Sequence, residues 1–159
     1  MNDLSPLRRM DRALSRNPNL APTVLRGALG LVFLGHAYAK LALFTLPGTA
    51  QFFEAHGLPG WAAYPVFALE LLGGVLLLLG IQVRLVAALL IPVMVGALGT
   101  HWDNGWMFTN QGGGWEYVAF LLAALYSQVL LGPGAWSIAR LSAIAMEPRP
   151  EPSAPARSS

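Results

Sequence analysis

Ionisable side chains interrupt the apolar stretches of this sequence. His36 and Lys40 lie in one stretch, and Glu70 lies in the next. An unpaired charge inside a bilayer costs several kcal/mol, so each of these groups is a candidate functional residue by default. A carboxyl or imidazole group can take up or release a proton, and an ammonium group can stabilise a nearby carboxylate. These residue types suit proton-coupled chemistry within a membrane.

The rise of an α-helix predicts that these groups can meet. At about 1.5 Å per residue, His36 lies about 15 Å and Lys40 about 9 Å inside a helix that ends at Leu46. By the same rise, Glu70 lies about 13.5 Å inside a helix that starts at Trp61. His36 and Glu70 should therefore be level, with Lys40 one turn away on the same face as His36. We expect Glu70 to pair with Lys40 or His36 in the bundle interior.

Two further ionisable residues, His101 and Glu116, lie at the adjoining ends of the next two helices. All four helices would then offer polar groups to one vestibule. We take Glu70, Glu116, His36, Lys40 and His101 as candidate catalytic residues. A structural alternative stays open, in which Glu70 and Lys40 only fix the register of two helices and the other groups lie among lipid head groups.

A polar and aromatic segment, HWDNGWMFTNQGGG, occupies residues 101–114. Its rings could stack on a flat head group, while side-chain amides and glycine N–H groups donate hydrogen bonds. The candidate ligand-binding residues here are Trp102, Trp106, Asn110 and Gln111, with Trp115 just beyond. The alternative is an interfacial anchor with a flexible glycine turn.

The sequence gives little support to thiolate, metal or phosphate-binding sites. The chain has no cysteine, which excludes thiolate chemistry and zinc–thiolate or iron–sulfur sites built from its own residues. The histidines and glutamates show no close metal-binding spacing, and we predict no metal site. Glycines that might suggest a phosphate loop, Gly27 with Gly30 and Gly73 with Gly74, lie mid-helix, where small residues let helices approach each other.

Composition places these residues in a membrane protein. Of the 159 residues, 55% are hydrophobic and 11% are charged, whereas an ordinary soluble domain has about 25% charged residues. The net charge is +2, but the basic residues are divided between two tails and one turn, so we expect no nucleic-acid partner. The expected environment is a lipid bilayer.

The apolar stretches predict an all-α fold, a bundle of four transmembrane helices within residues 22–140. A span needs about 20 residues, and the 40-residue stretch from Trp61 to Thr100 suits two spans with a short turn between them. The predicted helices are about 23–46, 61–80, 84–100 and 115–131.

The basic residues predict the topology. Nine of the ten Lys and Arg residues fall on one side of these spans, which the positive-inside rule makes cytoplasmic. Both termini would then be cytoplasmic, in a multi-pass protein of the plasma (inner) membrane. Residues 1–21 form a basic segment, either an interfacial helix or a disordered tail. Residues 141–159 are rich in Pro, Ser and Ala and should be disordered.

Several motifs, taken in order, resemble the DoxX-like family of small four-helix membrane proteins. They are LRGALGLVFLGHAYAKL, HGLPGW, LELLGGVLLLLGIQVRLVA and NQGGGWEYVAFLLAAL, and the resemblance covers about Leu25 to Ile138. The family is similar in part to the membrane subunit of thiosulfate:quinone oxidoreductases. The resemblance implies the fold and a candidate site whose polar or glycine positions here are Lys40, Glu70, Asn110, Gly113, Trp115, Glu116 and Tyr117.

The leading hypothesis is a quinone-interacting membrane subunit of an oxidoreductase system, with a protein partner in a redox complex or as a homo-oligomer. The carboxylates and histidines would handle protons, and the tryptophans would hold the ring. Whether the chain itself is an enzyme stays open. One alternative is a non-catalytic scaffold that recruits soluble redox enzymes, which would need the tails but not the Glu70 carboxylate. A third is a small transporter or channel, which the lack of an inverted repeat disfavours.

Overall fold

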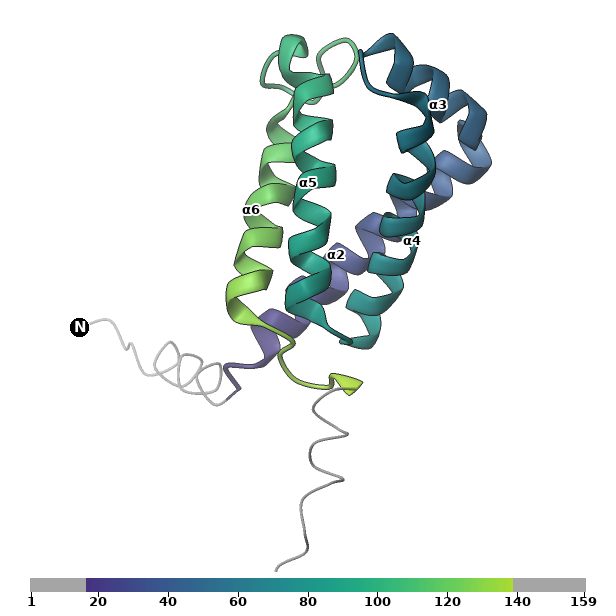
Figure 1. The fold of residues 1–159 in the computed structure, drawn as a ribbon. Coiled ribbons are helices and arrows are strands. Elements are labelled where there is room, and N and C mark those ends of the chain that lie inside the picture. Colours follow the sequence, from purple (N-terminus) through teal and green to yellow (C-terminus); the bar gives the residue numbers. More distant parts are fainter. Residues whose placement is uncertain (1–16, 139–159) are drawn as a thin grey trace, which may run out of the picture.

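The computed structural model of this chain describes residues 17–138, and these form an all-α bundle, as predicted (Figure 1). The predicted tail at 141–159, and the predicted basic segment as far as residue 16, lie outside the described residues. The α-helices of the described part are α2 (Leu20–Tyr38), α3 (Leu46–Ala55), α4 (Ala63–Leu79), α5 (Val83–His101) and α6 (Glu116–Leu131). A π-helical turn, η1 (Ala39–Leu43), extends α2, and two 3-10 turns, η2 (Gly60–Ala62) and η3 (Trp102–Asn104), precede α4 and follow α5.

Three helical segments are long and apolar enough to cross a membrane. They are Leu20–Leu43 with 24 residues, Gly60–Leu79 with 20 and Val83–Asn104 with 22. Each reaches the length of about 20 residues that a bilayer core requires. Helix α6 is also apolar but has only 16 residues. The chain is therefore a multi-pass membrane protein.

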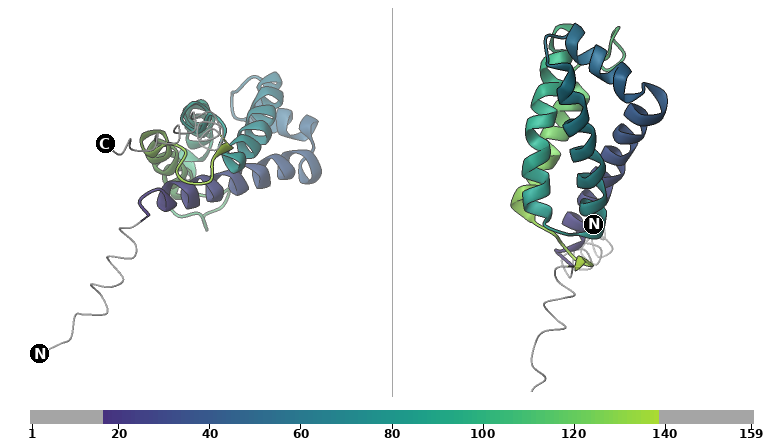
Figure 2. Two further views of the ribbon diagram at one scale, coloured as in Figure 1. Left: turned by 90° about the horizontal axis from the view of Figure 1, so that it is seen from below. Right: turned by 45° about the vertical axis from the view of Figure 1, so that its right-hand side comes forward.

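The long helices pack in antiparallel fashion. Helix α2 lies against α4 and α6, and α5 lies against the same two helices (Figure 2). The two ends of the bundle differ in chemistry. We call the end that holds Arg26 and Arg84 the arginine end. The opposite end, which we call the aromatic end, holds Trp61, Trp102, Trp106 and Trp115.

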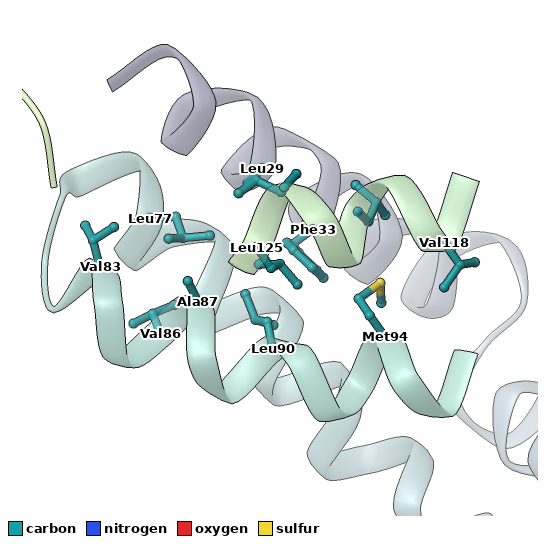
Figure 3. Close-up of a cluster of buried hydrophobic side chains, with 12 residues drawn as sticks. Leu29, Phe33, Leu77, Val83, Val86, Ala87, Leu90, Met94, Val118 and Leu125 are labelled. Carbon is teal, nitrogen blue, oxygen red and sulfur yellow. The ribbon is translucent and has the colours of Figure 1, made fainter. Parts of the chain in front are cut away.

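A hydrophobic cluster joins α2, α4, α5 and α6 (Figure 3). Phe33 of α2, Leu77 of α4, Leu90 of α5 and Leu125 of α6 are fully buried. The cluster also contains Leu29, Val83, Val86, Ala87, Met94, Val118, Leu121 and Ala124. Close packing of these side chains supplies the dispersion energy that holds helices together where lipid tails compete for apolar surface.

Two glycines bring α2 and α4 into close contact. A Cβ atom added at Gly30 would lie 2.9 Å from the backbone oxygen of Gly74, and one at Gly74 would lie 3.0 Å from that of Gly30. Any side chain here would push the helices apart. The predicted role in helix approach is confirmed for these two residues. It is wrong for Gly27, whose added Cβ would meet nothing within 4 Å.

The first predicted helix ends earlier than expected, and a helix replaces the loop that should follow it. The backbone reverses at Thr45, which has φ 61°, and its hydroxyl accepts a hydrogen bond of 3.2 Å from the N–H of Gly48. Pro47 then stands in the first turn of α3, where its missing N–H costs nothing. Pro47 directly follows the predicted helix 23–46, but in the structure it starts α3 rather than ending the helix before it.

Arginine side chains cap two helix ends at the arginine end. Arg26 is only 3% exposed, and it donates to the carbonyls of Leu77 and Leu78 at 2.7 and 2.6 Å. Arg84 donates to the carbonyls of Val129 and Leu130 at 2.6 and 2.9 Å. The last carbonyls of a helix lack N–H partners and carry partial negative charge. These arginines therefore stabilise the C-terminal ends of α4 and α6.

Candidate functional site

An ion pair joins α2 to α4 at the level predicted from the helical rise. The Nζ atom of Lys40 donates to both carboxylate oxygens of Glu70, at 3.0 and 2.7 Å. The Glu70 side chain is 1% exposed and that of Lys40 is 16% exposed. The predicted pairing of Glu70 is thus confirmed, with Lys40 rather than His36 as the partner.

The π-helical turn η1 places Lys40. The N–H of Phe44 donates to the carbonyl of Ala39 at 2.9 Å, five residues earlier, where an α-helix would have a spacing of four. Such a turn holds one extra residue and changes the direction of the side chains within it. Single π-turns inside α-helices are frequent at functional sites. The sequence carries no signal that predicts this turn.

A large cavity opens beside the ion pair, with a volume of about 1560 Å³. Its walls come from α2, η1, α3, α4, α5, α6 and the loop between α5 and α6. All five candidate catalytic residues line it: His36, Lys40, Glu70, His101 and Glu116. Most of the other lining side chains are apolar or aromatic, including Phe44, Phe53, Val66, Val93 and Met94. The structure therefore brings the predicted polar groups of four helices to one cavity.

The ring of His36 contacts α6. This ring stacks on that of Tyr117 in α6, with ring centroids 6.3 Å apart and an angle of 14° between the planes. Both residues line the cavity. The His36–Tyr117 contact links α2 to α6, whereas the Lys40–Glu70 pair links α2 to α4.

The loop from α5 to α6 is tied together by hydrogen bonds. His101 Nδ1 lies 3.0 Å from the carbonyl oxygen of Gly113, to which Asn104 also donates at 3.0 Å. Asn110 donates to the carbonyl of Asn104 at 2.8 Å. Glu116 Oε1 accepts from the N–H of Phe108 at 2.9 Å. This network fixes a cap over the aromatic end of the bundle and uses polar groups that were predicted to face a ligand.

The candidate ligand-binding residues divide into two groups. Trp106, Gly113 and Tyr117 line the cavity. The others, Trp102, Asn110, Gln111 and Trp115, are not among its lining residues.

The tryptophan rings contact one another. Trp102 stacks on Trp115 at 5.2 Å, and Trp106 meets Trp115 edge-on at 4.4 Å. Trp115 is therefore held between two indole rings, and it supports Trp106 rather than facing the cavity itself.

Sequence reasoning missed the part of the wall that α3 supplies. Gly48, Thr49, Phe52 and Phe53 of this helix line the cavity. The signal was present, because Thr45 followed by Pro47 is a typical helix start. Within residues 17–138, no group of three or more His, Asp and Glu side chains is placed to hold a metal ion.

The sequence of the chain is similar to those of known proteins. The DoxX family profile matches residues 21–102, more than half of the chain. A curated relative from Bacillus subtilis (strain 168), named "Putative oxidoreductase CatD", is 34% identical over 87 residues. That match covers 55% of this chain and 63% of the relative, so the chain spans less than two thirds of the relative's length. No solved structure matches the chain.

Proposed function

We propose that this chain, which belongs to the DoxX family, is the membrane subunit of an oxidoreductase system and binds a quinone head group in its cavity. The observation that carries the proposal is the buried Lys40–Glu70 pair in the wall of a largely apolar cavity. The name of the bacterial relative supports the redox class. The electron donor would be a protein partner, because this chain has no cysteine.

The cavity is large enough to hold a quinone head group, and its lining has the chemistry of a ligand site. Ligand sites are mostly apolar and hold a few polar groups that fix orientation, in volumes of about 300 to 1,000 Å³. The ammonium group of Lys40 has three N–H donors. Two point at the oxygens of Glu70, which leaves one for a carbonyl oxygen of the ligand. The pair would thus orient a head group and place a carboxylate beside it.

Two-electron reduction of a quinone consumes two protons. Glu70 and Glu116 would supply or relay these protons, with His36 or His101 as the next groups along, since all four line the cavity. Trp106 and Tyr117 would contact the ring from the aromatic end and from α6. The apolar remainder of the wall would exclude water from the head group.

We further propose that α6 is the fourth span and that the arginine end faces the cytoplasm. The 16 residues of α6 extend about 24 Å, less than the bilayer core of about 30 Å, so the membrane would thin locally around this helix. Both termini then lie in the cytoplasm, and the cavity opens in the outer half of the plasma membrane. The charge distribution supports this orientation.

Two glycines of α5 offer a matched test. Gly96 lines the cavity and Gly99 does not, and an added Cβ at either residue would meet nothing within 4 Å. Gly96→Phe should fill part of the cavity and weaken quinone binding by about tenfold or more. Gly99→Phe should leave binding unchanged.

The measurement is quinone titration of the detergent-purified protein, with thermal unfolding as the check on folding. A wild-type protein that binds no quinone would refute the proposal. Equal affinities in the two phenylalanine variants would show that the cavity is not the binding site.

A further inference from the structure

A second, shallower groove adjoins the cavity on the outside of the bundle. It lies between α2 and α6 and has a volume of about 320 Å³. Its lining residues are Leu31, Val32, Gly35, His36, Ala39 and Tyr117. Three of them, His36, Ala39 and Tyr117, also line the cavity. The stacked rings of His36 and Tyr117 therefore stand where the cavity and the groove adjoin.

With the helices spanning the membrane as proposed above, the groove faces lipid. It lies along the second half of the segment Leu20–Leu43, and apart from His36 and the Tyr117 hydroxyl its lining is apolar. Leu31 is 64% exposed and Tyr117 is 42% exposed, so both present side-chain surface on the outside of the bundle. A groove of this kind accepts a hydrocarbon chain rather than a polar partner.

The cavity is larger than a head group requires. Its volume of about 1560 Å³ exceeds the range of about 300 to 1,000 Å³ that is usual for small-molecule sites. Its lining is mostly apolar, and the polar groups that would orient a head group are few. A lining of this kind suits an amphipathic molecule whose polar end lies at Lys40.

We infer that the ligand of the cavity carries a hydrocarbon tail and that this tail leaves the bundle through the α2–α6 groove, past His36 and Tyr117. The inference rests on the proposed function and specifies its substrate class, a lipid quinone rather than a water-soluble one. Gly35 is then a residue that determines specificity. It is exposed, lines the groove, and has open space where a Cβ would be.

Substitution of Gly35 tests the route of the tail. Gly35→Leu should fill the groove and leave the Lys40–Glu70 pair in place. Gly27→Leu is the matched control, because Gly27 lies on the same helix, has equally open space at its Cβ and lines neither the groove nor the cavity. Gly35→Ala, with a smaller side chain, should show a graded effect and serves if the leucine variant does not fold.

The probes are a tail-less benzoquinone and the same head group with a decyl chain, titrated into the full chain in detergent. Gly35→Leu should weaken binding of the decyl probe by about tenfold or more and leave the tail-less probe within about twofold. Gly27→Leu should change neither affinity.

The outcomes separate the two proposals. If wild-type protein binds both probes and folded Gly35→Leu binds the decyl probe with wild-type affinity, the inferred route is wrong and the proposed function stands. An equal loss in Gly27→Leu would also overturn the route. If wild-type protein binds neither probe, the proposed function fails and the inference fails with it.

Discussion

At the scale of single residues, the Lys40–Glu70 pair is the main support for the proposed quinone site. A buried ion pair contributes little net stability over an apolar pair of the same size, but removing one partner leaves a charge without compensation. The Glu70 side chain is 1% exposed, so this rule for fully buried pairs applies to it. The pair therefore has to be tested by changing both residues as well as each one.

Glu70→Gln should lower the free energy of unfolding by about 3 kcal/mol, because it leaves the Lys40 ammonium without its carboxylate. The double variant Lys40→Met with Glu70→Gln should recover part of that loss, and quinone binding should remain weak in both. Chemical denaturation in detergent and quinone titration on the same samples give the two readouts. Normal quinone affinity in the stable double variant would assign the pair a purely structural role.

The sequence was sufficient to predict this pair but not its details. Helical rise alone placed His36 level with Glu70 and Lys40 one turn away, and the energetic cost of a lone charge implied a partner. The choice of Lys40 over His36 depends on the π-turn at Ala39–Leu43 and on Tyr117, which lies opposite His36. Both features depend on tertiary packing that no local residue pattern reveals.

At the scale of elements, the contact between α2 and α4 sets the distance across which the pair must reach. Gly30 and Gly74 meet backbone to backbone, ten residues before Lys40 on α2 and four after Glu70 on α4. The helices can approach closely only because neither residue has a side chain. The geometry of the ion pair therefore depends on two residues that carry no chemistry.

Gly30→Leu should separate α2 from α4, because its Cβ would lie 2.9 Å from the backbone oxygen of Gly74. We expect a loss of about 1 to 3 kcal/mol in the free energy of unfolding, as for other overpacked sites, together with weaker quinone binding. Gly27→Leu, on the same helix, should cost less than about 0.5 kcal/mol. Similar losses in the two variants would refute the close-approach argument.

Element boundaries were predictable where the sequence has one clear signal. Gly80, with φ 71°, ends α4 where the prediction placed the end. Pro47 is an ambiguous signal, because proline occurs both after the end of one helix and in the first turn of another. Only the Thr45 hydroxyl, bonded to the Gly48 N–H, decides between these readings.

At the scale of the whole molecule, charge separates the two ends of the bundle. Arg26 and Arg84 cap helices at one end, whereas the aromatic end holds four tryptophans and no Lys or Arg. This separation, through the positive-inside rule, is the basis of our proposal that the arginine end faces the cytoplasm. A shared vestibule was predicted from the polar groups of four helices, but the walls and the volume of the cavity could not be, since they arise from the arrangement of α3 and the α5–α6 loop around these helices.

The absence of cysteine makes the orientation directly testable. Asp103→Cys lies in the cap at the aromatic end, and Gln82→Cys lies in the turn at the arginine end; both positions are exposed. In intact cells, a membrane-impermeant maleimide should label Asp103→Cys at once and Gln82→Cys only after permeabilisation. The reverse pattern would place the cavity on the cytoplasmic side.

The most direct measurement of the central claim is photolabelling of the purified full chain with a photoreactive quinone, followed by mapping of the adducts by mass spectrometry. We expect adducts on residues that line the cavity, such as Val66, Val93 and Tyr117. An excess of unlabelled quinone should remove them, and Gly96→Phe should reduce them. Adducts that unlabelled quinone does not displace, or that map to the arginine end, would contradict a quinone site in this cavity.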